Sequence, residues 1–230
     1  MCGRYALYGP HSRYREYFGT PDDLDLPPRY NIAPSSLLPV VRQGADGLRH
    51  FLMAKWGLIP SWVKDPSQWS HPINAKAETA DTKPMFRHAF KKSRVLVPAD
   101  GFYEWKVENG RKQPYYIHLR DGSPFGFGGL LEHWNGPNGE LLTFAILTTG
   151  PNELMATIHD RMPVIIRPEH YGDWLDPSLT DADSIRAMIG SYDAPAMGAY
   201  PVTRKVNSPA NDGPELLLRQ SDPIGIRDEK

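Results

Sequence analysis

Tight turns at regular intervals constrain the fold of this chain more than any other feature of its sequence. Asp-Gly and Asn-Gly pairs favour the left-handed backbone conformations that tight hairpins require. Such pairs separate segments rich in aromatic and β-branched residues, and they are Asp46-Gly47, Asn109-Gly110, Asp121-Gly122 and Asn138-Gly139. The 230 residues also include 20 glycines and 23 prolines. Together they make up roughly 19% of the chain, against ~12% in average usage. The sequence therefore predicts many short strands joined by turns.

Seven segments have the composition of strands. They are residues 49–59, 94–106, 113–119, 126–134, 141–149, 163–166 and 200–206. Because turn signals, and few helical segments, separate them, we expect antiparallel pairing in place of parallel strands joined by helices.

Helices are predicted to be few and short, over residues 11–18, 84–92, 152–159, 169–175 and 183–189. Asn152 is a suitable N-cap for its helix, and Thr180 and Asp181 are cap candidates for the last one. We find no internal repeat and no linker long enough to divide the chain. The sequence predicts one α+β domain, residues 1–218, with a curved, barrel-like antiparallel β-sheet flanked by short helices, followed by a C-terminal tail, residues 219–230.

The charge of the chain restricts its partners. Lys and Arg number 26 against 27 Asp and Glu, so the formal net charge is -1. A neutral body exerts no general attraction on nucleic acid or anionic lipid, so DNA binding requires a local basic patch. No apolar run approaches the ~18 residues of a membrane span, and no signal peptide is evident. We expect a cytoplasmic protein without membrane contact.

Cofactors and metals have no sequence signature here. The single cysteine excludes an intrachain disulfide and a multi-cysteine zinc site. HExxH, CxxC and a GxGxxG after a strand are also absent. We therefore expect neither a metal nor a cofactor.

The single cysteine, Cys2, directly follows the initiator methionine. Removal of Met1 would place a thiol and a primary α-amine on one residue. An α-amine has a pKa of ~7.7–8.0 against ~10.4 for lysine, so far more of it is a neutral nucleophile at physiological pH. Such an amine forms a Schiff base with an aldehyde, and the thiol can then close a thiazolidine ring on the same carbon. The alternative is that a cysteine stands at this position by chance.

Two further segments contain candidate catalytic carboxylates and amides. Asn74, Lys76 and Glu78 alternate along a predicted extended segment and would share one face, either of a pocket or of a solvated strand. Glu104 lies between Tyr103 and Trp105. Aromatic neighbours could raise its pKa for general acid–base catalysis, or the side chain could face solvent on an alternating strand.

His159 closes the predicted helix 152–159, and Asp160 and Arg161 begin the following turn. The negative end of a helix dipole favours a protonated imidazole, which suits a proton donor. The alternative is a histidine that only caps its own helix.

Six motifs together resemble the SOS response-associated peptidase family, also called abasic site processing proteins. In chain order they are MCGRY (1–5), YNIAP (30–34), WGLIPSW (56–62), INAKAET (73–79), PADGFYEW (98–105) and IHDRMP (158–163). Residues 202–207 also resemble the last strand of the family, so the resemblance covers nearly the whole chain. It implies an α+β fold with a barrel-like sheet and a protein that joins itself covalently to abasic sites in single-stranded DNA, notably near replication-fork junctions, in DNA repair.

The resemblance also implies roles for the candidate residues. Cys2 would supply amine and thiol to the aldehyde of the ring-opened sugar. Asn74 would orient the amine, Glu104 would assist proton transfer, and His159 would help open the sugar.

Residues for DNA contact follow from the same motifs. Arg4, Lys76 and Arg161 could grip phosphates. The family usually has arginine in place of Lys76, and lysine lacks the bidentate fork of arginine. Trp62 and Met85 could stack on or wedge between bases, with Trp62 on a loop, whereas Phe86 fits core packing.

Other functions remain open from the residues alone. A cysteine peptidase would use Cys2 with His159 and Asn74, and could remove Met1 from its own chain. A binding module would hold single-stranded DNA without a covalent bond. A Schiff base at the lesion would also permit strand cleavage by β-elimination, a lyase activity. We expect a monomer, associated with the nucleoid if the source is bacterial.

Overall fold

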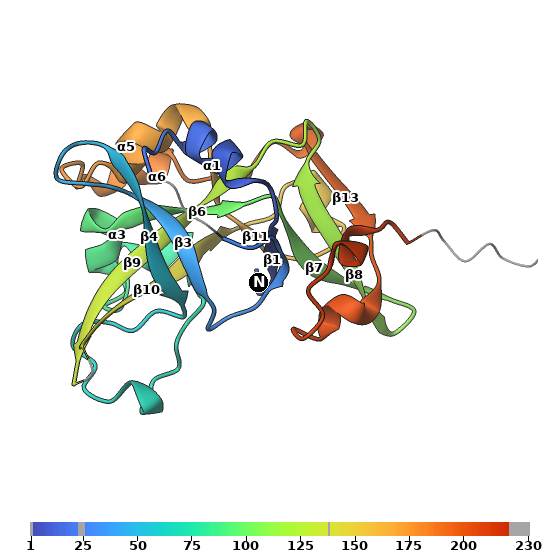
Figure 1. The fold of residues 1–230 in the computed structure, drawn as a ribbon, viewed down its shortest axis with the longest axis horizontal. Coiled ribbons are helices and arrows are strands. Elements are labelled where there is room, and N and C mark those ends of the chain that lie inside the picture. The colour runs from blue at the N-terminus through green and yellow to red at the C-terminus, as the bar shows by residue number, and fades with distance from the viewer. Residues whose placement is uncertain (1, 23–25, 138, 221–230) are drawn as a thin grey trace, which may run out of the picture.

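A five-stranded barrel forms the centre of the computed structural model, which describes residues 2–22, 26–137 and 139–220 (Figure 1). Its strands follow the order β10-β4-β3-β6-β9, and pairing of β9 with β10 closes the ring. Their bounds are β3 Leu37–Gln43, β4 Arg49–Trp56, β6 Arg94–Ala99, β9 Phe125–Gly136 and β10 Gly139–Thr149. Three short strands extend this sheet: β5 Asn74–Lys76, β11 Met162–Pro163 and β12 Ile165–Ile166.

A second sheet of five antiparallel strands lies beside the barrel (Figure 1). Its order is β13-β8-β7-β1-β2. The bounds are β1 Tyr5–Leu7, β2 Arg29–Ile32, β7 Gly101–Glu108, β8 Arg111–Leu119 and β13 Met197–Pro201. The predicted α+β class and barrel-like antiparallel sheet are confirmed.

Two pairings within the barrel sheet are parallel, contrary to the prediction. Strand β10 runs parallel to β4, with Thr143 opposite Lys55, and parallel to β5. The physical reason for the first pairing is the number of strands in the ring. Five strands cannot alternate in direction all the way round, so one neighbouring pair must run the same way.

The predicted strand 94–106 is instead two strands in different sheets, β6 and β7, because Asp100 turns the chain between them. The buried carboxylate of Asp100 accepts hydrogen bonds from the backbone N–H groups of Tyr8 at 2.7 Å and Gly9 at 3.0 Å, and from the Tyr14 hydroxyl. A Cβ at Gly101 would collide with the ring of Tyr116 on the neighbouring strand, so this corner requires glycine.

The turn predictions are right in most places. Asp46-Gly47 joins β3 to β4, and Asn109-Gly110 joins β7 to β8 with both residues at positive φ. Asp121-Gly122 connects β8 to β9, which lie in different sheets, so this turn is not a hairpin. Gly139 opens β10 of the β9–β10 hairpin, while Asn138 lies outside the described residues.

The helices are α1 His11–Phe18, α2 Ala77–Ala80, α3 Arg87–Lys92, α4 Glu153–Ala156, α5 Tyr171–Leu175 and α6 Ala182–Ala187. Of the five predicted helices, the first has the predicted bounds and the other four are shorter, and α2 was not predicted. Both N-caps are confirmed, because Asn152 accepts from the N–H of Met155 and Asp181 from that of Ser184, each at 2.8 Å. The final predicted strand, 200–206, ends early: β13 stops at Pro201, and a 3-10 turn, Arg204–Asn207, follows.

The chain end remains attached to the second sheet as far as it is described. Arg219 forms a β-bridge with Val202, and the N–H of Gln220 donates to the carbonyl of Pro201 at 2.8 Å. The rest of the predicted tail, residues 221–230, lies outside the described residues. Across the described ranges, no helix has the length and apolar character needed to span a membrane.

Candidate functional site

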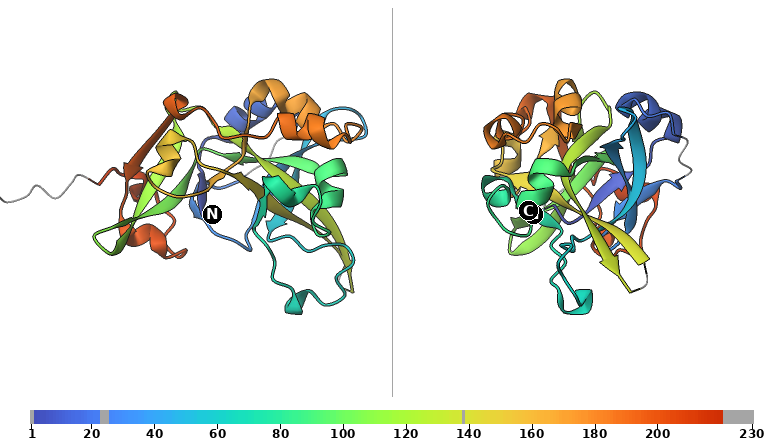
Figure 2. Two further views of the ribbon diagram at one scale, coloured as in Figure 1. Left: turned by 180° about the vertical axis from the view of Figure 1, so that it is seen from behind. Right: turned by 90° about the vertical axis from the view of Figure 1, so that its left-hand side faces the viewer.

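The N-terminal segment enters the molecule between the barrel and the second sheet, where the label N lies in Figures 1 and 2. Cys2 is fully buried, although it is the second residue of the chain. The N–H of Tyr103 donates to the carbonyl of Arg4 at 2.9 Å, and this pairing continues from Tyr5 opposite Phe102. The register therefore brings the first residues of the chain alongside Glu104 on β7.

Burial raises the pKa of the Cys2 thiol far above its ordinary value, and the negative charge of Glu104 raises it further. A backbone hydrogen bond from Arg4 partly opposes the rise. The thiol is therefore protonated at neutral pH.

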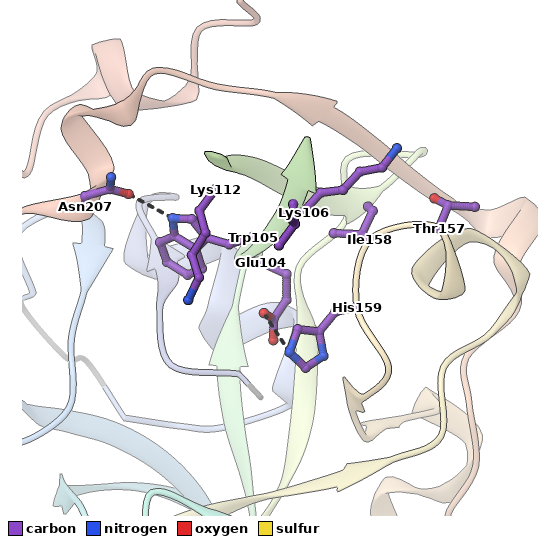
Figure 3. A pocket seen from close by; sticks show the side chains of 9 residues that line it. Glu104, Trp105, Lys106, Lys112, Thr157, Ile158, His159 and Asn207 are labelled. Atoms are coloured by element: carbon purple, nitrogen blue, oxygen red, sulfur yellow. Dashed lines mark hydrogen bonds and ion pairs between the residues drawn. The ribbon is translucent and has the colours of Figure 1, made fainter. Parts of the chain in front are cut away.

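Glu104 and His159 form the titratable pair of the site. The imidazole Nε2 of His159 lies 3.9 Å from Oε2 of Glu104, and the Glu104 side chain is 3% exposed (Figure 3). Burial raises the pKa of Glu104 above 4.5, and the charge of His159 lowers it in part. A carboxyl group with a raised pKa keeps its proton to a higher pH than an ordinary glutamate, which suits general acid–base catalysis.

The other ring nitrogen of His159, Nδ1, has a hydrogen-bond donor and a hydrogen-bond acceptor as neighbours. The backbone N–H of Arg161 donates to Nδ1 at 3.0 Å, which favours the neutral tautomer with its proton on Nε2, toward Glu104. The exposed carboxylate of Asp160 lies 2.9 Å from Nδ1 and favours a proton there. The backbone amide is fixed and Asp160 is 88% exposed, so the amide sets the tautomer of the neutral ring.

A cavity of about 880 Å³ opens beside this pair (Figure 3). Glu104 and His159 lie at one end, and Lys106 and Lys112 extend from β7 and β8 along the wall. The indole N–H of Trp105 donates to Oδ1 of Asn207 at 2.8 Å, which fixes the ring in the wall. The cavity is wide enough for a nucleotide-sized group, and two lysines lie along its wall.

Asn74 and Lys76 lie on β5, which pairs with β10. Asn74 Nδ2 donates weakly to the carbonyl of Ile146 at 3.4 Å. Its Oδ1 is buried, and within the described residues no donor reaches it. Lys76 is exposed at the end of the strand. The prediction that Glu78 continues this extended face is wrong, because the strand ends at Lys76 and Glu78 lies in α2.

Arg161 is partly buried and bound by other protein groups. Its guanidinium makes a bidentate pair with Glu78 at 2.6 and 2.9 Å and donates to the carbonyl of Thr148 at 2.6 Å. Thr148 lies opposite Lys76 on β10. The motif resemblance did not single out Glu78 or Thr148 as partners of Arg161, because the contact joins residues 83 and 13 positions apart.

Arg4 is similarly engaged, donating from one nitrogen to Oδ1 of Asn31 at 2.8 Å and to the carbonyl of Val206 at 2.9 Å. Its Nε is buried and meets no acceptor within the described ranges. Arg4 therefore connects the N-terminal strand to β2 and to the segment after β13. Some N–H groups of its guanidinium remain available as hydrogen-bond donors.

Trp62 and Met85 lie outside the lining of the Glu104–His159 cavity. Trp62 is 53% exposed on the loop between β4 and β5, as predicted. Met85 is half-buried against the core, and Phe86 is buried in it, which confirms the core packing predicted for Phe86. The structure thus brings Cys2, Glu104 and His159 together, with Asn74, Lys76 and Arg161 on the adjoining β10 edge.

Metal ligands do not gather at this site. Among the described residues, no three His, Cys, Asp or Glu side chains form a group that could hold a metal ion.

Comparison with known proteins assigns the family. The family model "SOS response associated peptidase (SRAP)" matches residues 1–209. The chain belongs to this family. The abasic site processing protein YoqW of Bacillus subtilis is 44% identical over 223 residues, which covers 94% of this chain and 99% of that protein. YoaM of the same bacterium, also named an abasic site processing protein, is 41% identical over 94% of this chain and 97% of its own length.

The same fold occurs in solved structures. A protein from Bacteroides thetaiotaomicron superposes with a TM-score of 0.86 and 28% sequence identity, over 96% of this chain and all of that one. The family resemblance expected from the six motifs is confirmed.

Proposed function

We propose that this protein binds abasic sites in single-stranded DNA and joins itself covalently to them through Cys2 once Met1 has been removed. The observation that carries the proposal is the burial of the second residue of the chain beside the Glu104–His159 pair. The names of the relatives YoqW and YoaM support the choice of an abasic site as the target.

The proposed reaction uses the amine first and the thiol second. The neutral α-amine of Cys2 attacks the aldehyde carbon of the ring-opened sugar, and loss of water yields a Schiff base. The sulfur then adds to the same carbon, while the thiol proton passes to the nitrogen. The product is a thiazolidine, and the net reaction releases one water without any oxidant or reductant.

The roles of the surrounding side chains follow from their positions. Glu104, with its raised pKa, accepts and returns protons at the amine and thiol, and His159 helps to open the sugar and protonate its oxygen. The buried acceptor Oδ1 of Asn74 suits a hydrogen bond from the amine. The exposed Lys76 is proposed to contact a phosphate directly, whereas Arg4 and Arg161, which already bind protein groups, would do so with the donors that remain.

The state of the thiol favours this mechanism over a general cysteine peptidase. Cysteine peptidases attack with a thiolate, which requires a lowered pKa. In the chain that retains Met1, burial and Glu104 raise the pKa of Cys2 instead. A thiol that acts second, after the amine has made an electrophilic imine, does not need to be ionised at rest.

The proposal is tested by the intact mass of the purified protein before and after incubation with a single-stranded oligonucleotide that carries one abasic site. The expected masses are the chain without Met1, and then that chain plus the oligonucleotide minus one water. Shortened DNA fragments in the same sample would reveal accompanying lyase activity. A chain that keeps Met1 and yields no denaturant-resistant product would refute the proposal.

Glu104→Gln is expected to slow adduct formation by about 10²- to 10⁴-fold, the usual contribution of a general acid–base group. Glutamine fills the same space but cannot exchange a proton. The rate is measured on denaturing gels from pH 5 to 9. The wild-type profile should contain a step above the ordinary pKa range of glutamate, because burial raises that pKa, and the variant should lack it.

Glu140→Gln, at an exposed carboxylate on β10, should behave as wild type. Equal rates for both variants would remove Glu104 from the mechanism.

The same substitution should alter the pH dependence of stability. The folded-state pKa of Glu104 lies above its unfolded value of 4.5. Between these values the folded state holds the proton that the unfolded state has lost, so stability falls as pH rises through the folded pKa. The Glu104→Gln variant should lack this fall, which urea unfolding at several pH values would measure.

Trp62→Ala is expected to weaken DNA binding by about 1–3 kcal/mol, the usual worth of one stacked base. The free energy of unfolding should change little, because the ring is 53% exposed. Affinity is measured on an oligonucleotide with a tetrahydrofuran in place of the abasic sugar, which cannot form the aldehyde. Leu48→Ala is the matched control, since Leu48 is also 53% exposed. Equal losses in both variants would exclude a specific role for Trp62.

A further inference from the structure

A basic segment that the motifs do not include lies at the start of α3. Between residues 82 and 94 the chain has Lys83, Arg87, Lys91, Lys92 and the buried Arg94, and it has no Asp or Glu. The first four are exposed. Within the described ranges, no ion pair engages any of these four. On a chain with net charge -1, this is a strong local concentration of positive charge.

Helix geometry aligns two of these cations. The N–H of Arg87 donates to the carbonyl of Lys83 at 2.9 Å, so the two residues lie one helical turn apart. Residues at this spacing share one face of a helix. Phe86, Ala89 and Phe90 are buried in the core, whereas Lys83 and Arg87 are both exposed. The two cations therefore reach the surface from positions one turn apart.

The stability of the helix does not explain this pair. Lys91 and Lys92 lie in the last turn, where cations are favoured by the helix dipole. Arg87 is the first helical residue and Lys83 precedes it, at the end where cations are disfavoured. Two like charges one turn apart also repel each other. A role outside folding accounts better for Lys83 and Arg87.

The loop that carries Trp62 is anchored beside this helix. The carboxylate of Glu132 on β9 accepts a hydrogen bond from the N–H of Ser61, and Nδ1 of His88 on α3 lies 3.9 Å from it. Two further hydrogen bonds hold the loop on either side of this point. The Thr143 hydroxyl accepts from the N–H of Ile59 at 2.9 Å. The Trp134 indole donates to the carbonyl of Val63 at 2.6 Å.

The anchored loop and α3 both lie on the side of the molecule away from the second sheet (Figures 1 and 2). Ser61 and His88, the sequence neighbours of Trp62 and Arg87, thus both lie beside the Glu132 carboxylate. An aromatic ring with neighbouring cations is the combination that binds bases and phosphates of one strand.

We propose that Lys83 and Arg87 form a phosphate-binding surface for the DNA backbone on the Trp62 side of the abasic site. This inference rests on the proposed function. It gives the protein the local basic patch that a neutral chain needs in order to hold DNA. The surface neutralises phosphates without reading bases, so it stabilises the flank of a lesion of any sequence.

The test compares two variants that lose the same charge. Lys83→Gln/Arg87→Gln removes the proposed surface, and Arg42→Gln/Arg120→Gln removes two exposed arginines from β3 and the end of β8. Both are titrated with a single-stranded oligonucleotide that carries a tetrahydrofuran lesion, from 50 to about 300 mM salt. Each phosphate contact contributes about 0.7 to the slope of log K against log salt concentration, so the first variant should lose about 1.4 of slope.

Two oligonucleotides, one with nucleotides only 5′ of the lesion and one with nucleotides only 3′ of it, show which side the surface contacts. The Lys83→Gln/Arg87→Gln variant should bind one of the two more weakly than wild type does and bind the other equally well. It should also unfold at the same urea concentration as wild type or higher, since it removes charge repulsion. Equal slopes for wild type and both variants would overturn the inference, while a wild-type adduct in the same preparation would leave the proposed function standing. A wild-type protein that binds no oligonucleotide and forms no adduct would overturn both.

Discussion

Cys2→Ala is expected to eliminate the denaturant-resistant adduct with abasic DNA. The α-amine survives on alanine once Met1 is removed, but the sulfur that closes the ring does not. The product should therefore stop at a Schiff base, which water reverses. The measurement is the intact mass of the variant after incubation with the abasic oligonucleotide, with and without borohydride, which reduces a Schiff base to a stable amine.

The outcome distinguishes an amine-first reaction from a thiol-only one. An adduct trapped by borohydride in the Cys2→Ala variant, and absent without it, would identify the amine as the first nucleophile. Cys2→Ser should behave in the same way, because serine also retains the amine. A stable adduct of Cys2→Ala without borohydride would exclude the thiazolidine. The mass of each free variant must first show that Met1 has been lost, because a retained methionine blocks the amine.

Arg94→Met is expected to lower the free energy of unfolding by about 3–5 kcal/mol, because a buried cation makes several hydrogen bonds at one position. Arg94 is 3% exposed and donates to five backbone carbonyls. Two of these belong to the last turn of α3, Phe90 and Lys91. The others lie at the end of α5 and beyond it: Trp174, Asp176 and Leu179. Methionine would leave all five without this donor.

The charge of Arg94 persists in its buried position. Burial lowers its pKa to about 10, which still leaves the guanidinium protonated at neutral pH. Arg167→Met is the control, since Arg167 is 39% exposed and its ion pair with Asp193 is worth at most about 1 kcal/mol. Urea unfolding of both variants, compared at equal m-values, measures the difference. A loss below about 1 kcal/mol for Arg94→Met would show that water replaces the guanidinium at the helix ends.

Local patterns predicted the parts of this protein that depend on neighbouring residues. The hairpin turn at Asn109-Gly110 follows from the positive φ values that these residues tolerate. The caps at Asn152 and Asp181 follow from side chains that reach the next turn of their own helix. The exposed Trp62 followed from its place after Pro60 and Ser61.

Errors arose where distant segments decide the conformation. The sequence of residues 94–106 predicted one strand. The turn at Asp100 depends on hydrogen bonds from the backbone N–H groups of Tyr8 and Gly9, which the sequence of this segment does not contain. Glu78 appeared to continue an extended face, whereas it lies in helix α2 and pairs with Arg161.

The sequence by itself determined the turn-rich α+β character of the chain, its family and the residue types available for chemistry at Cys2, Glu104 and His159. The tertiary structure alone decided that these residues, more than fifty positions apart, lie close together, with Cys2 and Glu104 buried and His159 partly exposed. It also decided that a ring of five strands must contain a parallel pair, and that His88, next to Arg87, lies beside the carboxylate that holds the loop of Trp62. The physical reason is that periodicity and capping act over a few residues, whereas burial, pKa and charge clustering depend on packing between segments far apart in the chain.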